Sequence, residues 1–400
     1  MSINLPSPTT KAQSDDRQKS LLPRLPGHLG GGVNPNVIAG REAGLVEKRH
    51  LVLKRWFQEQ AVRGGRTFID FGTDYYYPFY DDYGPTRLAL DAIVQDRDSA
   101  RHYPSSYGTV EVREEFARFM LRRFSIACDP QRDVMVSTGA SQVFDALSRT
   151  YVGRYVLVPE LALSTVTSIA RGNGAEVVRI PTDADSLPDL DQLEEMVVRL
   201  GPTRIRFVYL NSPVNPTGAV LSRQYLTELV ALARRHKVLV LHDQDSWFTV
   251  HSGEAAANIL EVPGAREVAV TVMSLSKELG LPGIRVGFVM GNERVINELR
   301  IHNSEFCVMI PEFCQAAAAA ALRAFEDDGE RSRVQGRISV ALEAAVRGWK
   351  QLGWPDEALK LPDAGYKFLL RPPEQFSDMQ LRDVAGVELY PASEIGRAHV

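Results

Sequence analysis

A lysine that follows two hydroxyl residues at the end of a predicted strand is the residue best suited to chemistry. Lys277 comes after Ser274 and Ser276, and an apolar strand is expected just before them, over Val268–Met273. A lysine at a strand end of an α/β sheet projects into the crevice where ligands bind, and its amine can form an imine with an aldehyde. Arg285 lies eight positions later, and hydroxyl and guanidinium groups suit a phosphate. An aldehyde that carries a phosphate is pyridoxal 5'-phosphate (PLP), so the segment predicts this cofactor.

A second segment, Ser137–Gln142, joins a predicted strand to a predicted helix. Gly139 permits a tight turn, and the N-terminus of the helix offers free N–H groups and the positive end of its dipole to an anion. This signal is weak when it stands alone, because any strand–helix turn can contain glycine.

Asn215 and Asp243 follow two further predicted strands, Ile205–Leu210 and Val238–Leu241. The sequence Asn-Pro-Thr-Gly at 215–218 favours a rigid loop, from which the asparagine amide can donate to a phenolate oxygen; a mere turn is the alternative. The carboxylate of Asp243 can pair with a pyridinium N–H and keep the ring able to accept electrons. Local capping is the alternative for this aspartate.

In order and spacing, these residues resemble the PLP-dependent class I/II aminotransferases of fold type I. The resemblance covers roughly residues 66–400, and it rests on Asn-Pro-Thr-Gly, an aspartate 28 residues after that asparagine, and Ser-x-x-Lys with an arginine at plus eight. It implies an α/β fold with a large domain, whose mostly parallel sheet is covered by helices on both faces, and a smaller α+β domain. Apolar strands alternating with amphipathic helices between residues 110 and 300 predict such a sheet independently.

The resemblance also implies a role for each matching residue. Lys277 is the imine lysine and proton shuttle, Asp243 pairs with the ring nitrogen, and Asn215 bonds the ring oxygen. Tyr103 matches a tyrosine that reaches the phosphate from the partner subunit, which implies a homodimer. Gly72 matches the glycine beside the substrate carboxylate. The other implied cofactor-binding residues are Ala140, Ser141, Ser274 and Arg285 at the phosphate, and Ser246 and Leu161 near the ring.

Three positions depart from the family pattern. Ser246 stands where the family has a tyrosine that bonds the ring oxygen, and Leu161 where it has an aromatic ring stacked on the cofactor. Arg397 lies too early to match the arginine that clamps the substrate carboxylate bidentately.

These departures leave more than one function open. The first hypothesis is an aminotransferase that moves an amino group from an amino acid to a 2-oxo acid. The second is a PLP lyase or cyclase that performs β- or γ-elimination or replacement on a modified amino acid in specialised biosynthesis. Base rates within the family favour the first. A regulatory domain on the same fold is a third reading, which the intact Lys277 and the lack of a helix-turn-helix signal disfavour.

Several side chains near these motifs carry weaker expectations. The aromatic residues between Tyr75 and Tyr83 are expected to pack on a core or a partner, with a substrate wall as the alternative. Trp247 is a candidate for reshaping the wall of the site. Asp245 is expected to be a solvated or capping carboxylate, with contact to a cationic substrate as the alternative. His242 is expected to be structural.

Composition bounds the remaining possibilities. The 400 residues contain 44% hydrophobic and 24% charged residues, with a formal net charge of -4, which is ordinary for a globular enzyme and favours neither nucleic acid nor an anionic membrane. Three cysteines without metal-ligand spacing fit a reducing compartment, and no apolar run is long enough to span a membrane. We therefore expect a cytoplasmic enzyme with no metal. Its expected divisions are an N-terminal arm and helix (1–66), a large PLP-binding domain (67–303) and a small C-terminal domain (304–400).

Overall fold

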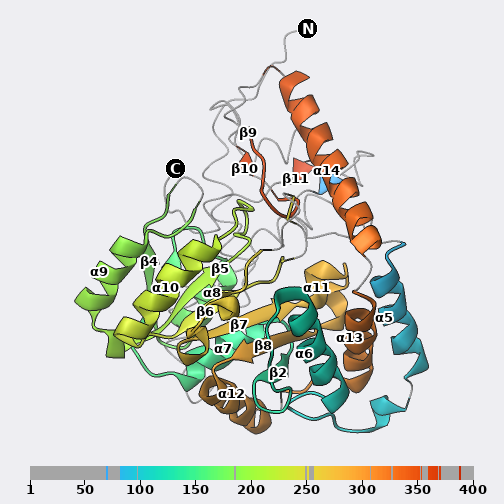
Figure 1. Cartoon of the computed structure of the whole chain (residues 1–400), viewed down its shortest axis with the longest axis horizontal. Coiled ribbons are helices and arrows are strands. Elements are labelled where there is room, and N and C mark those ends of the chain that lie inside the picture. The colour runs from blue at the N-terminus through green and yellow to red at the C-terminus, as the bar shows by residue number, and fades with distance from the viewer. Residues whose placement is uncertain are drawn as a thin grey trace, which may run out of the picture.

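The chain forms a central seven-stranded sheet with helices on both faces (Figure 1). This computed structural model describes residues 69–70, 82–96, 98–183, 186–247, 250–251, 256–306, 308–325, 328–351, 353, 359–367, 369–370 and 387–388. The strands of the sheet are β2 (Val134–Ser137), β3 (Tyr155–Pro159), β4 (Glu176–Ile180), β5 (Ile205–Asn211), β6 (Val240–Asp243), β7 (Ala269–Ser274) and β8 (Gly287–Gly291). The predicted α/β fold class is therefore confirmed.

The strand order is β2-β8-β7-β6-β5-β3-β4. The pairs β3–β4, β3–β5, β5–β6 and β6–β7 are parallel, whereas β8 runs antiparallel to both of its neighbours, β2 and β7. Six strands thus share one direction and only β8 is reversed within this sheet. The carboxyl ends of the six and the beginning of β8 consequently lie at the same edge.

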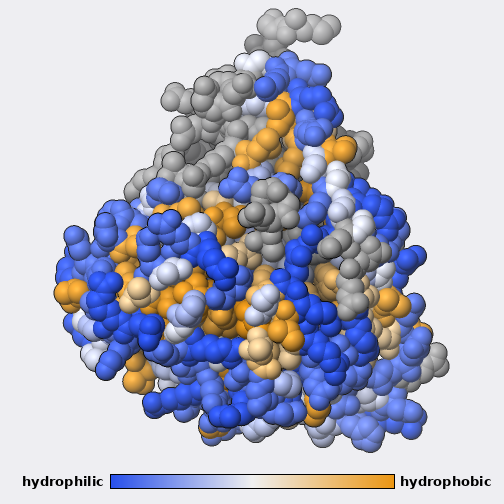
Figure 2. Space-filling model, in the orientation of Figure 1, coloured by the Kyte–Doolittle hydropathy of each residue, from blue (hydrophilic) through white to orange (hydrophobic). Residues whose placement is uncertain are grey.

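Two layers of helices bury the two faces of the sheet. The face that carries Phe207 and Tyr209 of β5 is covered by α7 (Ala140–Thr150), α8 (Ser164–Gly172) and α12 (Glu293–Glu305). The opposite face, with Val208 and Leu210, is covered by α6 (Val110–Phe124), α9 (Leu190–Leu200) and α10 (Arg223–His236). Alternate residues of one strand therefore enter different cores, as the period of two in a strand requires. On the face shown in Figure 2, hydrophilic residues form most of the rim and hydrophobic residues gather towards the middle.

The helix ends are determined by side-chain caps in several cases. Thr109, Asp189, Ser222 and Asn292 each accept a hydrogen bond from the backbone of the first turn of α6, α9, α10 and α12 respectively, which satisfies N–H groups that a helix leaves free. The amphipathic helices expected between residues 110 and 300 are present as α6, α7, α8, α9 and α10. The helix expected over 37–64 and the N-terminal arm lie outside the described residues.

The run of alanines lies on α13 (Glu312–Ala324), which packs against α6 and against α5 (Gly84–Gln95). Figure 1 shows α5 and α13 side by side at one end of the sheet. Ala317, Ala318, Ala319 and Ala321 are fully buried, because small side chains let two helices approach closely. The alanine run is therefore part of a packed helix and not a linker.

The remaining elements lie before and after the sheet in the chain. The long helix α14 (Asp328–Gln351) runs away from the sheet in Figure 1. Short strands β9 (Leu359–Lys360) and β10 (Leu369–Leu370) pair antiparallel, and β1 (Ile69–Asp70) pairs in parallel with β11 (Val387–Glu388). The domain boundaries at 66/67 and 303/304 stay predictions. No helix in the described part of the chain is long and apolar enough to cross a membrane.

Candidate active site

Strand register brings the predicted site residues to one edge of the sheet. Gly287, the first residue of β8, is aligned with Ser137 at the end of β2 and with Ser274 at the end of β7. A Cβ atom on Gly287 would lie 3.0 Å from the Cα atom of Gly139, so the turn after β2 lies directly against the start of β8. Lys277 follows β7, so it lies near this edge as well.

A candidate anion site lies where these segments meet. Gly139 has φ +84° and precedes α7, and no side chain in the described part of the structure caps this helix. Its first N–H groups, which include those of Ala140 and Ser141, are therefore available to an anion. The guanidinium of Arg285 donates to the Thr138 carbonyl at 2.9 Å, and a Cβ on Gly139 would lie 2.7 Å from Nη2 of that arginine.

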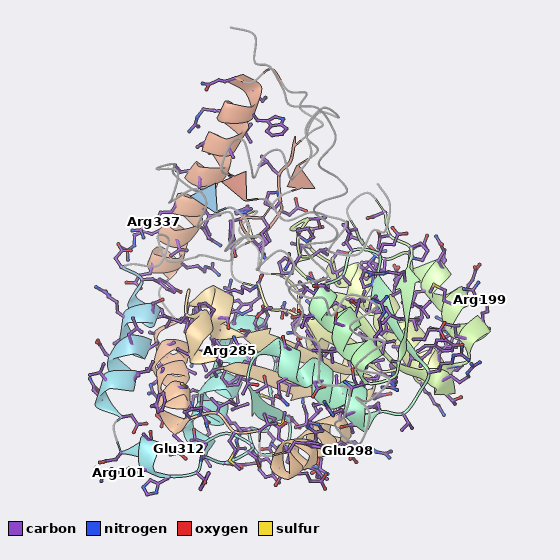
Figure 3. All side chains as sticks on the ribbon, turned by 180° about the vertical axis from the view of Figure 1, so that it is seen from behind. Arg101, Arg199, Arg285, Glu298, Glu312 and Arg337 are labelled. Carbon is purple, nitrogen blue, oxygen red and sulfur yellow. The ribbon has the colours of Figure 1, made fainter. Side chains whose placement is uncertain are left out.

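Ser274 completes this group of residues. Its buried hydroxyl accepts a hydrogen bond from the Ser276 N–H at 3.0 Å and begins the short helix α11 (Leu275–Glu278) that contains Lys277. Figure 3 shows Arg285 near the centre of the view beside the sheet, whereas Arg101 and Arg199 lie at the periphery. A guanidinium, a hydroxyl and a helix N-terminus thus lie at the same edge of the sheet, a combination that suits a phosphate.

Asp243, the last residue of β6, is 2% exposed and accepts a hydrogen bond from the hydroxyl of fully buried Tyr209. The Tyr209 oxygen lies 2.8 Å from Oδ2, and Oδ1 is buried without a hydrogen-bond partner among the described residues. Burial, together with the charge of Asp245, raises the pKa of Asp243 to about 7, although the Tyr209 hydrogen bond acts in the opposite direction. A buried carboxylate oxygen without a donor is what a pyridinium N–H would satisfy.

Asp245 lies against the predicted imine lysine. Its Oδ2 is 3.5 Å from Nζ of Lys277, and the two side chains are only 24% and 18% exposed. The expected role of a solvated or capping carboxylate is therefore not what the structure shows. Sequence reasoning missed this ion pair and also missed Tyr209.

The profile of one protein family, described as aminotransferase class I and II, matches residues 69–363. The chain belongs to this family. Aminotransferases of this class use PLP, and the enzyme is accordingly a PLP-dependent aminotransferase of fold type I.

Named relatives are themselves aminotransferases. The LL-diaminopimelate aminotransferase of Gloeobacter violaceus is 33% identical over 282 residues, which cover 68% of this chain and 69% of that protein. LL-diaminopimelate aminotransferase 2 of Trichormus variabilis is 31% identical over 270 residues, covering 66% and 68% of the two chains. The glutamate-pyruvate aminotransferase AlaC of Escherichia coli is 28% identical over 291 residues, covering 72% and 68%. These relatives do not favour the lyase or cyclase alternative.

Solved structures show the same fold. A probable N-succinyldiaminopimelate aminotransferase from Thermus thermophilus aligns with TM-score 0.74 and 27% identity, over 86% of this chain and 92% of that one. Apo-BacF from Bacillus subtilis aligns with TM-score 0.81 over 92% of each chain. Because BacF is only 22% identical, that likeness concerns the fold alone.

The residues of this aminotransferase fit PLP at both ends of the cofactor. The anion site suits its phosphate, and the free Oδ1 of Asp243 suits its ring N–H. Asn215 is half-buried in the loop after β5, and Leu161 is 4% exposed just beyond β3. Ser246 is half-buried in the turn after β6. The roles of these residues remain predictions.

Three residues that the sequence analysis named are not part of the candidate site as the structure describes it. Trp247 is 2% exposed and packs against Phe119, Phe124 and Phe325, with ring centroids 5.0, 5.9 and 5.5 Å apart. The expectation that it reshapes the site wall is wrong, because this large apolar ring is buried in the core between α6 and the end of α13. Gly72 and Arg397 lie outside the described residues.

Two further predictions concern a tyrosine and a histidine. Tyr103, on the loop before α6, is 95% exposed, as expected of a residue that acts on another subunit. His242 is fully buried, and burial lowers its pKa to about 4. This neutral core histidine is structural, as expected. Of the aromatic residues between 75 and 83, only Tyr83 is described; it is buried and packs edge-on against Phe325.

Proposed function

We propose that this aminotransferase moves the amino group of an α-amino acid to a 2-oxo acid, with Lys277 as the base that moves the proton. The observation that carries the proposal is the buried Oδ1 of Asp243, which has no hydrogen-bond partner in the part of the chain that the structure describes and lies at the same sheet edge as Lys277 and Arg285. When bound, PLP supplies a reactive aldehyde and a ring that accepts electrons.

Each residue then has a defined task. Arg285, Ser274 and the N-terminus of α7 hold the phosphate. Asp243 accepts a hydrogen bond from the ring nitrogen, and Asn215 donates to the ring oxygen. Nζ of Lys277 takes a proton from the α-carbon of the substrate and becomes an ammonium. Asp245 stabilises this ammonium, since its carboxylate lies within 4 Å.

The substrate proposal comes from the named relatives. Two of them are LL-diaminopimelate aminotransferases and a third is a glutamate-pyruvate aminotransferase. We therefore propose LL-diaminopimelate, glutamate and alanine as the first amino donors to test, with the corresponding 2-oxo acids as acceptors.

A half-reaction experiment tests the proposed function. The protein is loaded with PLP and mixed with each donor in the absence of an acceptor, and the oxo acid and ammonia released are measured. Transamination releases at most one oxo acid per active site and no ammonia, and turnover begins when a 2-oxo acid is added. Continuous release of ammonia without an acceptor would show elimination instead. Lys277→Ala is the control and should be inactive in both arms.

We also propose that the enzyme is a homodimer in which Tyr103 serves the site of the partner. The 95% exposure of its side chain supports this assignment. A Lys277→Ala variant and a Tyr103→Ala variant should both have little activity. Mixed under conditions that exchange subunits, they should regain roughly a quarter of the wild-type activity, because half of the dimers are hybrids with one intact site each. No recovery, with hybrids shown to form, would contradict the assignment.

We propose a cytosolic location from the state of the cysteines. Cys128 and Cys314, the two cysteines in the described part, are both free thiols, which suits a reducing compartment. Cell fractionation with antibodies against the enzyme would test this location.

A further inference from the structure

The hydrogen bond between Tyr209 and Asp243 joins two neighbouring strands beneath the proposed cofactor ring. In the ladder of β5 and β6, Tyr209 is aligned with Leu241 and Asn211 with Asp243. Tyr209 and Leu241 both belong to the core under α7 and α8. Since side chains two apart in a strand share a face, Tyr209 and Asp243 lie on the same face, where the phenol reaches the carboxylate at 2.8 Å.

The phenol is fixed in place by its surroundings. Tyr209 is fully buried, and the ring of Phe144 meets it edge-on, with centroids 5.5 Å apart and an interplanar angle of 84°. Phe144 belongs to α7, the helix whose N-terminus forms the anion site. Burial beside Asp243 raises the pKa of Tyr209 well above its usual value, so its hydroxyl stays protonated and donates.

We propose that Tyr209 is a positioning residue for the cofactor ring: it occupies Oδ2 of Asp243 and thereby orients Oδ1 toward the ring N–H. This inference rests on the proposed pairing of Asp243 with the ring nitrogen. A carboxylate on a strand end can rotate about its terminal bond, and a fixed donor to one oxygen removes that freedom. A hydrogen bond to a charged group also favours the ionised carboxylate, which is the form that accepts from a pyridinium.

A comparison of two ligands isolates this effect. Apo protein is titrated with PLP and with its analogue in which a C–H group replaces the ring nitrogen, and both dissociation constants are measured. Wild-type protein should prefer PLP, since only PLP can donate to Asp243. In Tyr209→Phe that preference should fall about tenfold, the typical effect of losing one hydrogen bond to a charged group, while affinity for the analogue stays within about twofold.

Two further variants complete the experiment. Asp243→Asn should lose the preference on its own, and adding Tyr209→Phe to it should change the preference no further. Tyr225→Phe is the matched control: its hydroxyl donates to the Pro188 carbonyl at 2.8 Å, on the opposite side of the sheet, and its loss should leave both affinities unchanged.

The outcomes separate this inference from the proposed function. If wild type shows no preference for PLP, Asp243 does not contact the ring nitrogen, and the proposed pairing fails together with the inference. If wild type and Tyr209→Phe show the same preference, the pairing stands and the role of Tyr209 is refuted. Equal weakening of both ligands in Tyr209→Phe would also refute it, since that result marks a residue that only supports the core. If Tyr209→Phe does not fold, an unchanged preference in Asp243→Asn overturns the pairing of Asp243 with the ring nitrogen, and the inference that rests on it fails with it.

Discussion

The amine of Lys277 lies 3.5 Å from Oδ2 of Asp245, and both side chains are largely buried. An anion at this distance favours the charged form of an amine. The resembling family has a tyrosine at the position of Ser246, and in this chain a carboxylate one residue earlier lies beside the amine. The Asp245 carboxylate is therefore part of the electrostatic surroundings of this amine.

Removing that carboxylate should make the amine of Lys277 more reactive. In apo Asp245→Asn, the midpoint of the pH dependence of the Lys277 acetylation rate should lie at lower pH than in wild type, because the anion that favours the charged amine is gone. Mass spectrometry of the peptide that contains Lys277 measures the labelling. Asp191→Asn, in the exposed first turn of α9, is the control and should leave the midpoint in place. An unchanged midpoint in Asp245→Asn would show that the ion pair does not govern the amine.

The buried carboxylate of Asp243 should make the apo enzyme less stable as pH rises. Burial raises its pKa from 3.8 to about 7, so folding favours the protonated acid and that advantage is lost between about pH 4 and pH 7. Asp243→Asn has no charge to bury. Its free energy of unfolding, relative to wild type, should rise from near zero at pH 4 to about 4 kcal/mol above pH 7.

Urea unfolding of both apo proteins from pH 4 to pH 8 measures this difference. His242 has the opposite sign: burial lowers its pKa from 6.5 to about 4, so its contribution is present above pH 6.5 and lost as the pH falls. Because His242 is present in both proteins, its effect cancels in the comparison. A difference that is constant with pH would contradict the prediction.

Gly139→Ala should weaken binding of the phosphate. Gly139 has φ +84°, which disfavours any side chain, and a Cβ there would lie 2.7 Å from the Arg285 guanidinium. Apo Gly139→Ala should bind PLP at least about tenfold more weakly, while its affinity for pyridoxal, which lacks the phosphate, changes little. Gly172→Ala is the control, since its Cβ would meet no described atom within 4 Å. Equal loss of both ligands in Gly139→Ala would point to general unfolding.

Trp247→Ala should destabilise the protein rather than alter specificity. The tryptophan is 2% exposed among Phe119, Phe124 and Phe325, and truncating such a ring to alanine costs about 3–5 kcal/mol. Denaturant unfolding should show this loss, and Val152→Ala, at a side chain that is 89% exposed, should show none. A stable variant with altered donor preference would restore Trp247 to the site wall.

The sequence predicted most of the sheet because its strands are apolar and its helices carry clear start and stop signals. Gly201, followed by Pro202, is such a stop signal and ends α9. Helix α12 was missed although Asn292 and Glu293 form a recognisable N-terminus. Helix α5 was missed because no side chain caps its start in the described structure; Pro85 was its main signal. Asp243 was expected beyond its strand and is instead its last residue, since the ladder with Asn211 continues.

At the site, spacing was enough to bring Lys277, Arg285 and Gly139 to the same edge of the sheet. The partners of these residues were not predictable in the same way. Tyr209 lies 34 residues before Asp243, and their contact depends on the register of two strands, which a single sequence does not reveal. Trp247 was misplaced because its distance from Asp243 in the chain says nothing about which way the turn after β6 directs it.

The reversed direction of β8 has a consequence for how this enzyme can change. Lys277 and Arg285 lie on one connection, residues 275–286, because the chain turns straight back from β7 to β8 instead of crossing over the sheet. A single insertion or deletion in that loop would displace both proposed attachments of the coenzyme at once. Variation that alters substrate choice while keeping the coenzyme should accordingly accumulate elsewhere, in the segments that enter the crevice from the other strands.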